Sequence, residues 1–361
     1  LADKYARAEA AVRLGADAVF ELPFPYSTAA AEFFARAGVF LLHALGADAI
    51  CFGTEGACRE ALLSAAQRLC STEFEEAFRL SAEDRTNAGI GYPALRQRVY
   101  TELYGTEDDA LLRTPNNTLG LEYLRAARVL APEMDTVCIP RTGDAHDADA
   151  PAPAPNAILS ASAIRARIEK DGTPAPALPY LPDAAADMLC AEAAAGHLCL
   201  SPEQMPGYAL LHFLRTTEPA ALARYAGLGG GLSGRLCAAA RQAATQKELF
   251  SLAATKKYTH AAIRRAALHG FFGITEEDLR TLPRYTVLLA ANTDAAAYLR
   301  TLHKHCPIPI LSRPASYRRC TEEVRSAFVG ALAADALWAS ALPSPISQAD
   351  LARSVPRMIR P

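Results

Sequence analysis

The sequence predicts an α/β protein, with a Rossmann-like domain built on a parallel sheet and then a mainly helical C-terminal region carrying a small β-α-β element. The first observation is a seven-residue pattern that occurs twice, as LGADAVF from Leu14 and as LGADAIC from Leu45. Each copy ends a helical pattern with glycine, turns through Ala-Asp-Ala and enters a short apolar run. The copies start 31 residues apart, about the length of one strand–helix–strand unit. We therefore expect two parallel strands joined by a crossover helix, with ligands bound at their carboxyl ends.

Apolar periodicity supports the further elements of the N-terminal part in order. A long helix is expected over residues 27–45, between the two copies of the pattern. A third unit follows, with a helix over residues 118–130 that Pro132 ends and a β-prone run over residues 135–140. Additional helices are expected over residues 4–14, 58–70, 74–80, 93–104 and 160–168. Because residues 4–14 form a crossover-like helix with no strand before it, we expect the beginning of this domain to lie upstream of Leu1.

The second half of the chain differs in its pattern. A Pro-rich stretch over residues 173–182 is typical of a linker, so we expect the α/β domain over residues 1–172 and a mainly helical region over residues 173–361. A last strand–helix–strand pattern is expected over residues 285–290, 294–303 and 308–311. Helices are expected over residues 184–194, 208–215, 219–225, 232–245, 247–253, 259–272, 276–281 and 322–338.

Composition narrows the class of protein. With 361 residues, 51% hydrophobic and 21% charged, the chain is globular and long enough for two domains. Its net charge of −2 means that any nucleic-acid contact must come from a local basic patch. Nine cysteines without a CxxC pair indicate reduced, buried thiols in the cytoplasm. No membrane span or signal peptide is expected, and the cluster from His303 to Cys306 lacks a second ligand group, so no metal site is expected.

Two residues at strand ends suggest a ligand site. Gly53 directly follows the second expected strand, where a glycine lets a ligand approach the backbone, although an ordinary loop glycine would look the same. Arg141 ends the third strand at the same sheet edge, and its charged fork suits phosphate or carboxylate. The alternative for Arg141 is a surface ion pair with Asp144 or Asp147.

Two helix starts add polar groups. Pro115-Asn116-Asn117-Thr118 precedes an expected helix, and two adjacent asparagines exceed what a cap requires, so one amide is left to read a base or a ribose. Ser160 is a natural N-cap, and Ser162 with Arg165 makes an anion cradle there, unless this is a plain capped helix. The segment from His146 to Asp149 offers acid–base groups, but a solvated turn fits it better.

The strongest basic cluster lies on and before a single expected helix. It consists of Lys256, Lys257, Arg264 and Arg265, with Tyr258 available to stack on a base. A solvated helix face explains the same residues equally well. A nucleic-acid surface at this helix is therefore a hypothesis that the sequence leaves open.

Together these segments resemble one family. They are Lys4-Tyr5-Ala6-Arg7, Val19-Phe20-Glu21-Leu22-Pro23, Phe52-Gly53-Thr54-Glu55, Pro115-Asn116-Asn117-Thr118-Leu119-Gly120, His146-Asp147-Ala148-Asp149, residues 160–165 and Lys257-Tyr258-Thr259. In this order they resemble the tRNA(Met) cytidine acetate ligases, which are nucleotidyltransferase-like proteins. The resemblance implies that ATP, with Mg²⁺, and acetate form acetyl-adenylate. The acetyl group then passes to the wobble cytidine of elongator tRNA(Met).

The resemblance also assigns residues. Gly53, Asn116 and Arg141 match the family's ATP contacts, while Ser162 and Arg165 match the helix start that nucleotidyltransferases place on phosphates. It identifies no catalytic side chain. The family's His-x-Gly-His phosphate loop is missing, since none of the eight histidines lies in such a motif, so we expect this chain to bind ATP poorly and to catalyse nothing by itself.

Two rival functions remain at this point. An adenylyltransferase with a small-molecule acceptor would need no RNA, and the basic residues from Lys256 to Arg265 count against it. A non-catalytic RNA-binding protein would have lost the phosphate loop. An in-frame His-x-Gly-His motif upstream of Leu1 would favour the ligase over this second rival.

Overall fold

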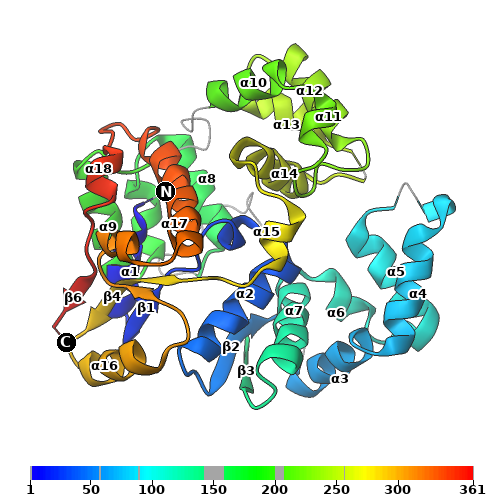
Figure 1. The fold of residues 1–361 in the computed structure, drawn as a ribbon, viewed down its shortest axis with the longest axis horizontal. Coiled ribbons are helices and arrows are strands. Elements are labelled where there is room, and N and C mark those ends of the chain that lie inside the picture. Colours follow the sequence, from blue (N-terminus) through cyan, green and yellow to red (C-terminus); the bar gives the residue numbers. More distant parts are fainter. Residues whose placement is uncertain are drawn as a thin grey trace. The chain divides into compact units, whose positions relative to one another are not determined.

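The computed structural model describes residues 2–56, 58–87, 90–141, 158–199, 207–255 and 257–360. The chain divides into two compact units. Figure 1 shows the helices and strands of which they consist. Unit 1 comprises Leu1–Phe24, Thr142–Leu210 and Arg284–Pro361, and unit 2 comprises Pro25–Arg141 and Leu211–Pro283. Helices and parallel strands occur in both units, which confirms the α/β fold class. The expected functional boundary after residue 172 falls inside unit 1.

Unit 1 is built on β4 (Thr286–Asn292), whose first six residues are buried. Because both faces of β4 are covered, its sequence TVLLAAN is apolar almost throughout. It pairs antiparallel with β1 (Ala18–Phe20) and parallel with β5 (Ile310–Leu311) and β6 (Arg357–Ile359). Side chains of α1 (Lys4–Arg13) and α17 (Glu322–Ala339) pack with β4 in one core. The other helices are α8 (Ala161–Asp171), η3 (Ala175–Tyr180), α9 (Asp183–Ala194), α16 (Ala296–His305), η5 (Pro314–Arg319) and α18 (Gln348–Leu351).

Unit 2 contains a parallel pair of strands, β2 (Ala49–Thr54) and β3 (Asp135–Pro140), in register from Ala49 opposite Asp135 to Thr54 opposite Pro140. The helices α2 (Ala31–Ala44) and α7 (Pro115–Leu130) lie beside this pair (Figure 1). They cover one of its faces, because Ile50 packs with side chains of both helices. Val137 and Ile139 on the other face are exposed. The sequence therefore alternates as expected for a sheet with one open face. Around it lie η1 (Tyr26–Thr28), α3 (Arg59–Leu69), α4 (Thr72–Glu83), η2 (Arg85–Asn87), α5 (Tyr92–Tyr104) and α6 (Asp109–Arg113).

The second segment of unit 2 is helical. Buried Leu236, Phe250 and Ile263 give successive helices an apolar side, and threonine hydroxyls cap two of them. Thr245 accepts a hydrogen bond from the Glu248 N–H at 3.2 Å. The helices are α10 (Gly207–Thr216), which belongs to this unit from Leu211 onward, α11 (Pro219–Leu222), α12 (Leu232–Gln242), α13 (Gln246–Ala253), α14 (His260–Phe272) and α15 (Glu276–Arg280).

The repeated pattern predicts local structure correctly but not strand pairing. Gly15 and Gly46 follow α1 and α2 with φ of 111° and 76°, a backbone region that glycine enters without strain, and both copies lead into strands. However, β1 lies antiparallel to β4, whereas β2 lies parallel to β3. The expectation of two neighbouring parallel strands is wrong. The glycine turn and the three-residue apolar run determine only the local backbone conformation. The pairing partner of β1 follows it in the chain by more than 260 residues, so the pattern holds no information about it.

The cysteines are free, but the expectation that they are buried is wrong for most of them. Cys199 and Cys237 are buried, whereas Cys51, Cys58 and Cys190 are exposed. Cys51 is exposed because strand alternation puts it on the open face of β2. In the part of the chain that the structure describes, no helix has the length and apolar character that crossing a membrane requires.

Candidate functional site

Gly53 and Arg141 lie together at the carboxyl ends of β2 and β3, as expected. The Arg141 N–H donates to the Thr54 carbonyl at 2.9 Å. A Cβ at Gly53 would lie 3.7 Å from Arg141 Cγ and 3.8 Å from the Ile139 oxygen, which are ordinary contacts, and Gly53 is not in the left-handed region. Neither strain nor packing among the described residues therefore requires glycine here. Its missing side chain leaves the backbone beside Arg141 accessible.

The two asparagines are inside α7 and not before it. Pro115 is the first residue of the helix, Thr114 is the N-cap, and no side chain caps this end. The expectation that an asparagine caps the helix is wrong, because proline suits the first position with its fixed φ and missing N–H. Asn117, fully buried, instead holds the backbone of Glu55: its Nδ2 donates to the Glu55 carbonyl and its Oδ1 accepts from the Glu55 N–H, both at 2.9 Å.

Glu55 brings the strand ends and the helix start together. Its Oε1 accepts hydrogen bonds from Asn116 Nδ2 at 2.8 Å and from Arg141 Nη1 at 3.3 Å. The Arg141 side chain is 42% exposed and that of Glu55 21% exposed. Asp144 and Asp147, the expected alternative partners of Arg141, lie outside the described residues. Glu55 lies in the segment after the second strand where the sequence predicts ligand binding, but sequence reasoning assigned it no role of its own in the site.

The second expected anion site is at the start of α8 in unit 1. Ser160 caps this helix as expected, accepting from the Ala163 N–H at 3.2 Å. Arg165 donates to Ser162 Oγ at 3.4 Å, and both side chains are exposed. Their role in the same site as Gly53 stays a prediction. The segment from His146 to Asp149 lies outside the described residues.

The basic cluster lies on and before α14. Lys256 is outside the described residues, and the Lys257 ammonium lies 5.4 Å from the centre of the Tyr258 ring. Arg264 is exposed, with its guanidinium 5.5 Å from the Phe250 ring centre. Arg265 is half-buried, and this burial lowers the pKa of its guanidinium. Of the two adjacent arginines, Arg264 is therefore better placed to meet a ligand from solvent.

This cluster belongs to a wider basic segment that the sequence analysis did not delimit. Residues 211–273 contain nine lysines and arginines but two acidic residues, in a chain whose net charge is −2. Several of these cations hold the helices together. For example, Arg215 donates to the Ala240 and Ala243 carbonyls, and Arg235 donates to the Ala253 carbonyl. The segment nevertheless carries a local positive charge that attracts polyanions.

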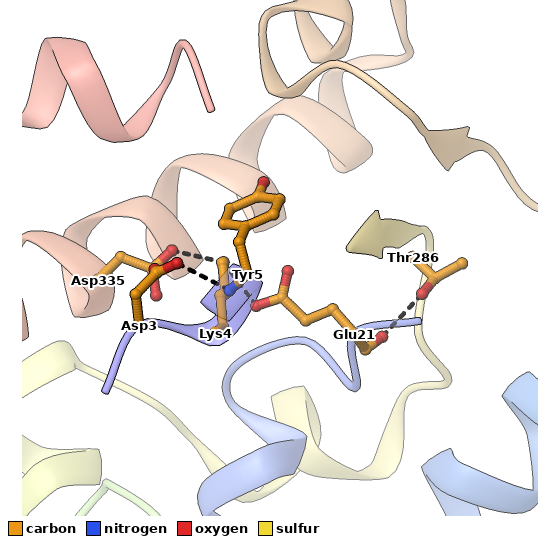
Figure 2. Close-up of polar contacts among 6 residues, drawn as sticks. All are labelled: Asp3, Lys4, Tyr5, Glu21, Thr286 and Asp335. Carbon is orange, nitrogen blue, oxygen red and sulfur yellow. Dashed lines mark hydrogen bonds and ion pairs between the residues drawn. The ribbon is translucent and has the colours of Figure 1, made fainter. Parts of the chain in front are cut away.

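A second polar cluster lies in unit 1 (Figure 2). Lys4 Nζ lies between two carboxylates, 2.7 Å from Glu21 Oε1 and 2.6 Å from Asp335 Oδ2. Asp3 caps α1, and Thr286 of β4 donates to the Glu21 carbonyl at 2.7 Å. Lys4 and Glu21 occur in motifs that carry the family resemblance, but no sequence signal pointed to Asp335. The cluster ties α1 to the end of β1 and to α17.

Burial and neighbouring charges shift the pKa values of Glu21 and Lys4 in opposite directions. Burial raises the pKa of Glu21, and the Lys4 ammonium opposes that rise. Burial also disfavours the ammonium form of Lys4, but Glu21 and Asp335 outweigh it and raise the pKa of Lys4. Lys4 is therefore a fixed positive charge whose donors already have acidic partners.

No metal centre forms among the described side chains, where no group of three His, Cys, Asp or Glu residues is placed to hold an ion. His303 and His305 lie in the last turn of α16, with Cys306 at its C-cap. The residues at the strand ends instead carry the kinds of polar group that can recognise a nucleotide. An open glycine backbone, the Asn116 amide, an arginine and a carboxylate offer donors and acceptors but no nucleophile.

Comparison with known proteins agrees with this arrangement. The family model of the HIGH nucleotidyl transferases matches residues 1–350. The tRNA(Met) cytidine acetate ligase of Syntrophotalea carbinolica is 33% identical over 322 residues, covering 86% of this chain and 73% of the relative. The enzyme of that name from Bacillus velezensis is 30% identical over 320 residues, covering 87% and 76%.

Solved structures show the same fold. The crystal structure of Thermotoga maritima TmcAL bound with alpha-thio ATP matches with a TM-score of 0.87 and 24% identity, covering 100% of this chain and 88% of that one. Its apo form matches with a TM-score of 0.89 and 23% identity. The chain therefore belongs to the HIGH nucleotidyl transferase family and, within it, to the tRNA(Met) cytidine acetate ligases.

Proposed function

We propose that this protein uses ATP and acetate to acetylate the wobble cytidine of elongator tRNA(Met), forming N4-acetylcytidine. The observation that supports this most is the convergence of Asn116 and Arg141 on Glu55, beside Gly53, at the carboxyl ends of two parallel strands, where α/β proteins bind nucleotides. The relatives' names supply the substrates, and one structural neighbour holds an ATP analogue.

The proposed reaction has two steps. A carboxylate oxygen of acetate attacks the α-phosphorus of ATP, the bond to pyrophosphate breaks, and acetyl-adenylate forms. The N4 amine of cytidine then attacks the acetyl carbonyl carbon, AMP leaves, and the amine loses a proton. Such chemistry needs positioned reactants and stabilised charge and not a protein nucleophile. Arg141 is our candidate for the positive charge near the nucleotide, and Mg²⁺ is expected to accompany ATP.

The two functions have separate regions in this proposal. ATP is bound within residues 1–172, by Gly53, Asn116 and Arg141, and Ser162 and Arg165 form a second candidate anion site. The tRNA is bound by residues 173–361, through the basic segment that includes Lys256, Lys257, Arg264 and Arg265. We also propose that the protein acts in the cytoplasm, where tRNA is modified.

The test follows pyrophosphate release and tRNA acetylation with the protein produced from its whole reading frame. Release that requires acetate, together with acetylation that is lost when the wobble cytidine is replaced by uridine, is the expected result. Pyrophosphate release without acetate would contradict the proposed activation step.

Arg141→Ala is expected to weaken ATP binding by about 1.5–3 kcal/mol, the usual range for a hydrogen bond to a charged group. Calorimetry with ATP measures the loss. Arg128→Ala is the matched control, because Arg128 is an exposed arginine of α7 for which we propose no ligand. Unchanged ATP affinity in a folded Arg141→Ala protein would exclude Arg141 as a ligand.

The double variants Lys256→Ala/Lys257→Ala and Arg264→Ala/Arg265→Ala are expected to weaken tRNA binding and leave acetyl-adenylate formation intact. Each lost phosphate contact should flatten the salt dependence by roughly one unit of slope. Filter binding of tRNA(Met) over a salt series gives both quantities. Because Arg264 is exposed and Arg265 half-buried, Arg264 should account for most of the second effect.

A control with equal charge loss is Arg318→Ala/Arg319→Ala, an exposed adjacent pair in unit 1. If this pair and the α14 variants change binding equally, net charge and not a defined surface explains the effect. If the α14 variants keep the parent affinity and slope, this helix does not contact the tRNA.

A further inference from the structure

The carboxylate of Glu55 has one engaged oxygen and one that no described residue meets. Oε1 accepts from Asn116 and Arg141, whereas no described residue donates to Oε2. The buried Asn117 amide fixes the Glu55 backbone through both its N–H and its carbonyl. The carboxylate is therefore held in place from its backbone and from its engaged oxygen, with the second oxygen left for a ligand.

The chemistry of this oxygen limits what it can meet. An ionised carboxylate only accepts hydrogen bonds, and it repels the phosphates of ATP, which are themselves anionic acceptors. The donors that ATP offers are the two ribose hydroxyls and the adenine amine. In α/β nucleotide-binding domains, an acidic residue of the sheet edge commonly meets a ribose hydroxyl.

We propose that Glu55 Oε2 accepts a hydrogen bond from a ribose hydroxyl of ATP and so selects ribonucleotides. The inference rests on the proposed ATP site and adds a specificity residue to it. Asn116 and Arg141 position the carboxylate, and Arg141, whose guanidinium carries five N–H donors, keeps others for the nucleotide. With the ribose beside Glu55, the phosphates are directed away from its negative charge.

Glu55→Gln isolates the proposed contact. Glutamine keeps one oxygen for Asn116 and Arg141 but replaces the second oxygen with an amide that donates. The experiment measures the affinity of the protein, produced from its whole reading frame, for ATP, 2′-deoxy-ATP and 3′-deoxy-ATP. Glu60→Gln is the matched control, because Glu60 is an exposed carboxylate five residues further along the chain.

Glu55→Gln should weaken ATP binding about tenfold, as expected for one lost charge-assisted hydrogen bond. The loss should fall below about twofold for the deoxynucleotide that lacks the hydroxyl read by Glu55. An equal loss for all three nucleotides would overturn the inference, because Glu55 would then meet the adenine amine or have only a structural role. Tighter ATP binding would overturn it as well, since Glu55 would then only repel the nucleotide. If the unchanged protein binds no ATP, the proposed function itself fails.

Discussion

Glu122→Ala is expected to lower the free energy of unfolding by about 3–5 kcal/mol, the range for breaking a buried ion pair by removing one partner. Glu122 of α7 contacts Arg96 of α5 and Arg125, whose Nη1 lies 2.9 Å from Glu122 Oε2. The side chains of Arg96 and Glu122 are 5% and 4% exposed. Alanine would leave two guanidinium groups without their carboxylate, and Arg125 Nε is already buried without a hydrogen-bond partner. Urea denaturation monitored by circular dichroism gives the change.

The control is Glu102→Ala, which breaks an exposed ion pair with Arg98 on α5 and should cost about 0.5 kcal/mol or less. Replacing Arg96, Glu122 and Arg125 together by apolar residues of similar size should recover much of the loss, because no charge then stays buried. A small loss in Glu122→Ala would mean that solvent reaches the two arginines.

Lys4→Met is expected to lower the free energy of unfolding, measured by urea denaturation, by about 3 kcal/mol, because it leaves the largely buried Glu21 carboxylate without its cation. Arg13→Ala provides a control on the same helix, since the Arg13–Asp187 pair is exposed and should contribute below about 1 kcal/mol. Adding Glu21→Gln to Lys4→Met should restore part of the loss. If the control costs as much as Lys4→Met, damage to α1 and not the buried charge explains both.

The loss of free energy of unfolding caused by Lys4→Met should increase with pH. Burial already raises the pKa of Glu21 above its ordinary value of 4.5, and without Lys4 that pKa rises further. Between the unfolded and the folded pKa values the folded state binds more protons, so the free energy of unfolding falls as pH rises. The difference between Lys4→Met and the parent should therefore be small near pH 4 and grow toward pH 8. A difference that does not change with pH would exclude Glu21 as its source.

Those features of the site that depend on neighbouring strands were predictable from sequence. Gly53 and Arg141 each follow an apolar run, and parallel strands bring their carboxyl ends to one edge, so their proximity followed from local patterns. The roles of Asn117 and Glu55 did not, because a buried amide that holds a distant backbone segment has no periodic signature. Pro115 was an available signal that α7 starts earlier than expected.

Long-range partners limited the prediction elsewhere. The antiparallel pairing of β1 with β4 and the contact of Lys4 with Asp335, 331 residues apart, depend on tertiary packing that no short window contains. The three-residue strand β6 and the four-residue helix α18 were missed, because such short elements carry too few residues to show a period.

The composition of unit 1 from three separate chain segments has a consequence during protein synthesis. Tyr5 and Val12 of α1 emerge from the ribosome long before β4, against which they pack, since Glu21 and its hydrogen-bond partner Thr286 are 265 residues apart. At about 5–20 residues per second, translation of this interval takes on the order of 10–50 s. During that time the apolar side of α1 has no sheet to cover it. The nascent chain is then a substrate for holding chaperones, while unit 2 can complete its own core before the strand β4 appears.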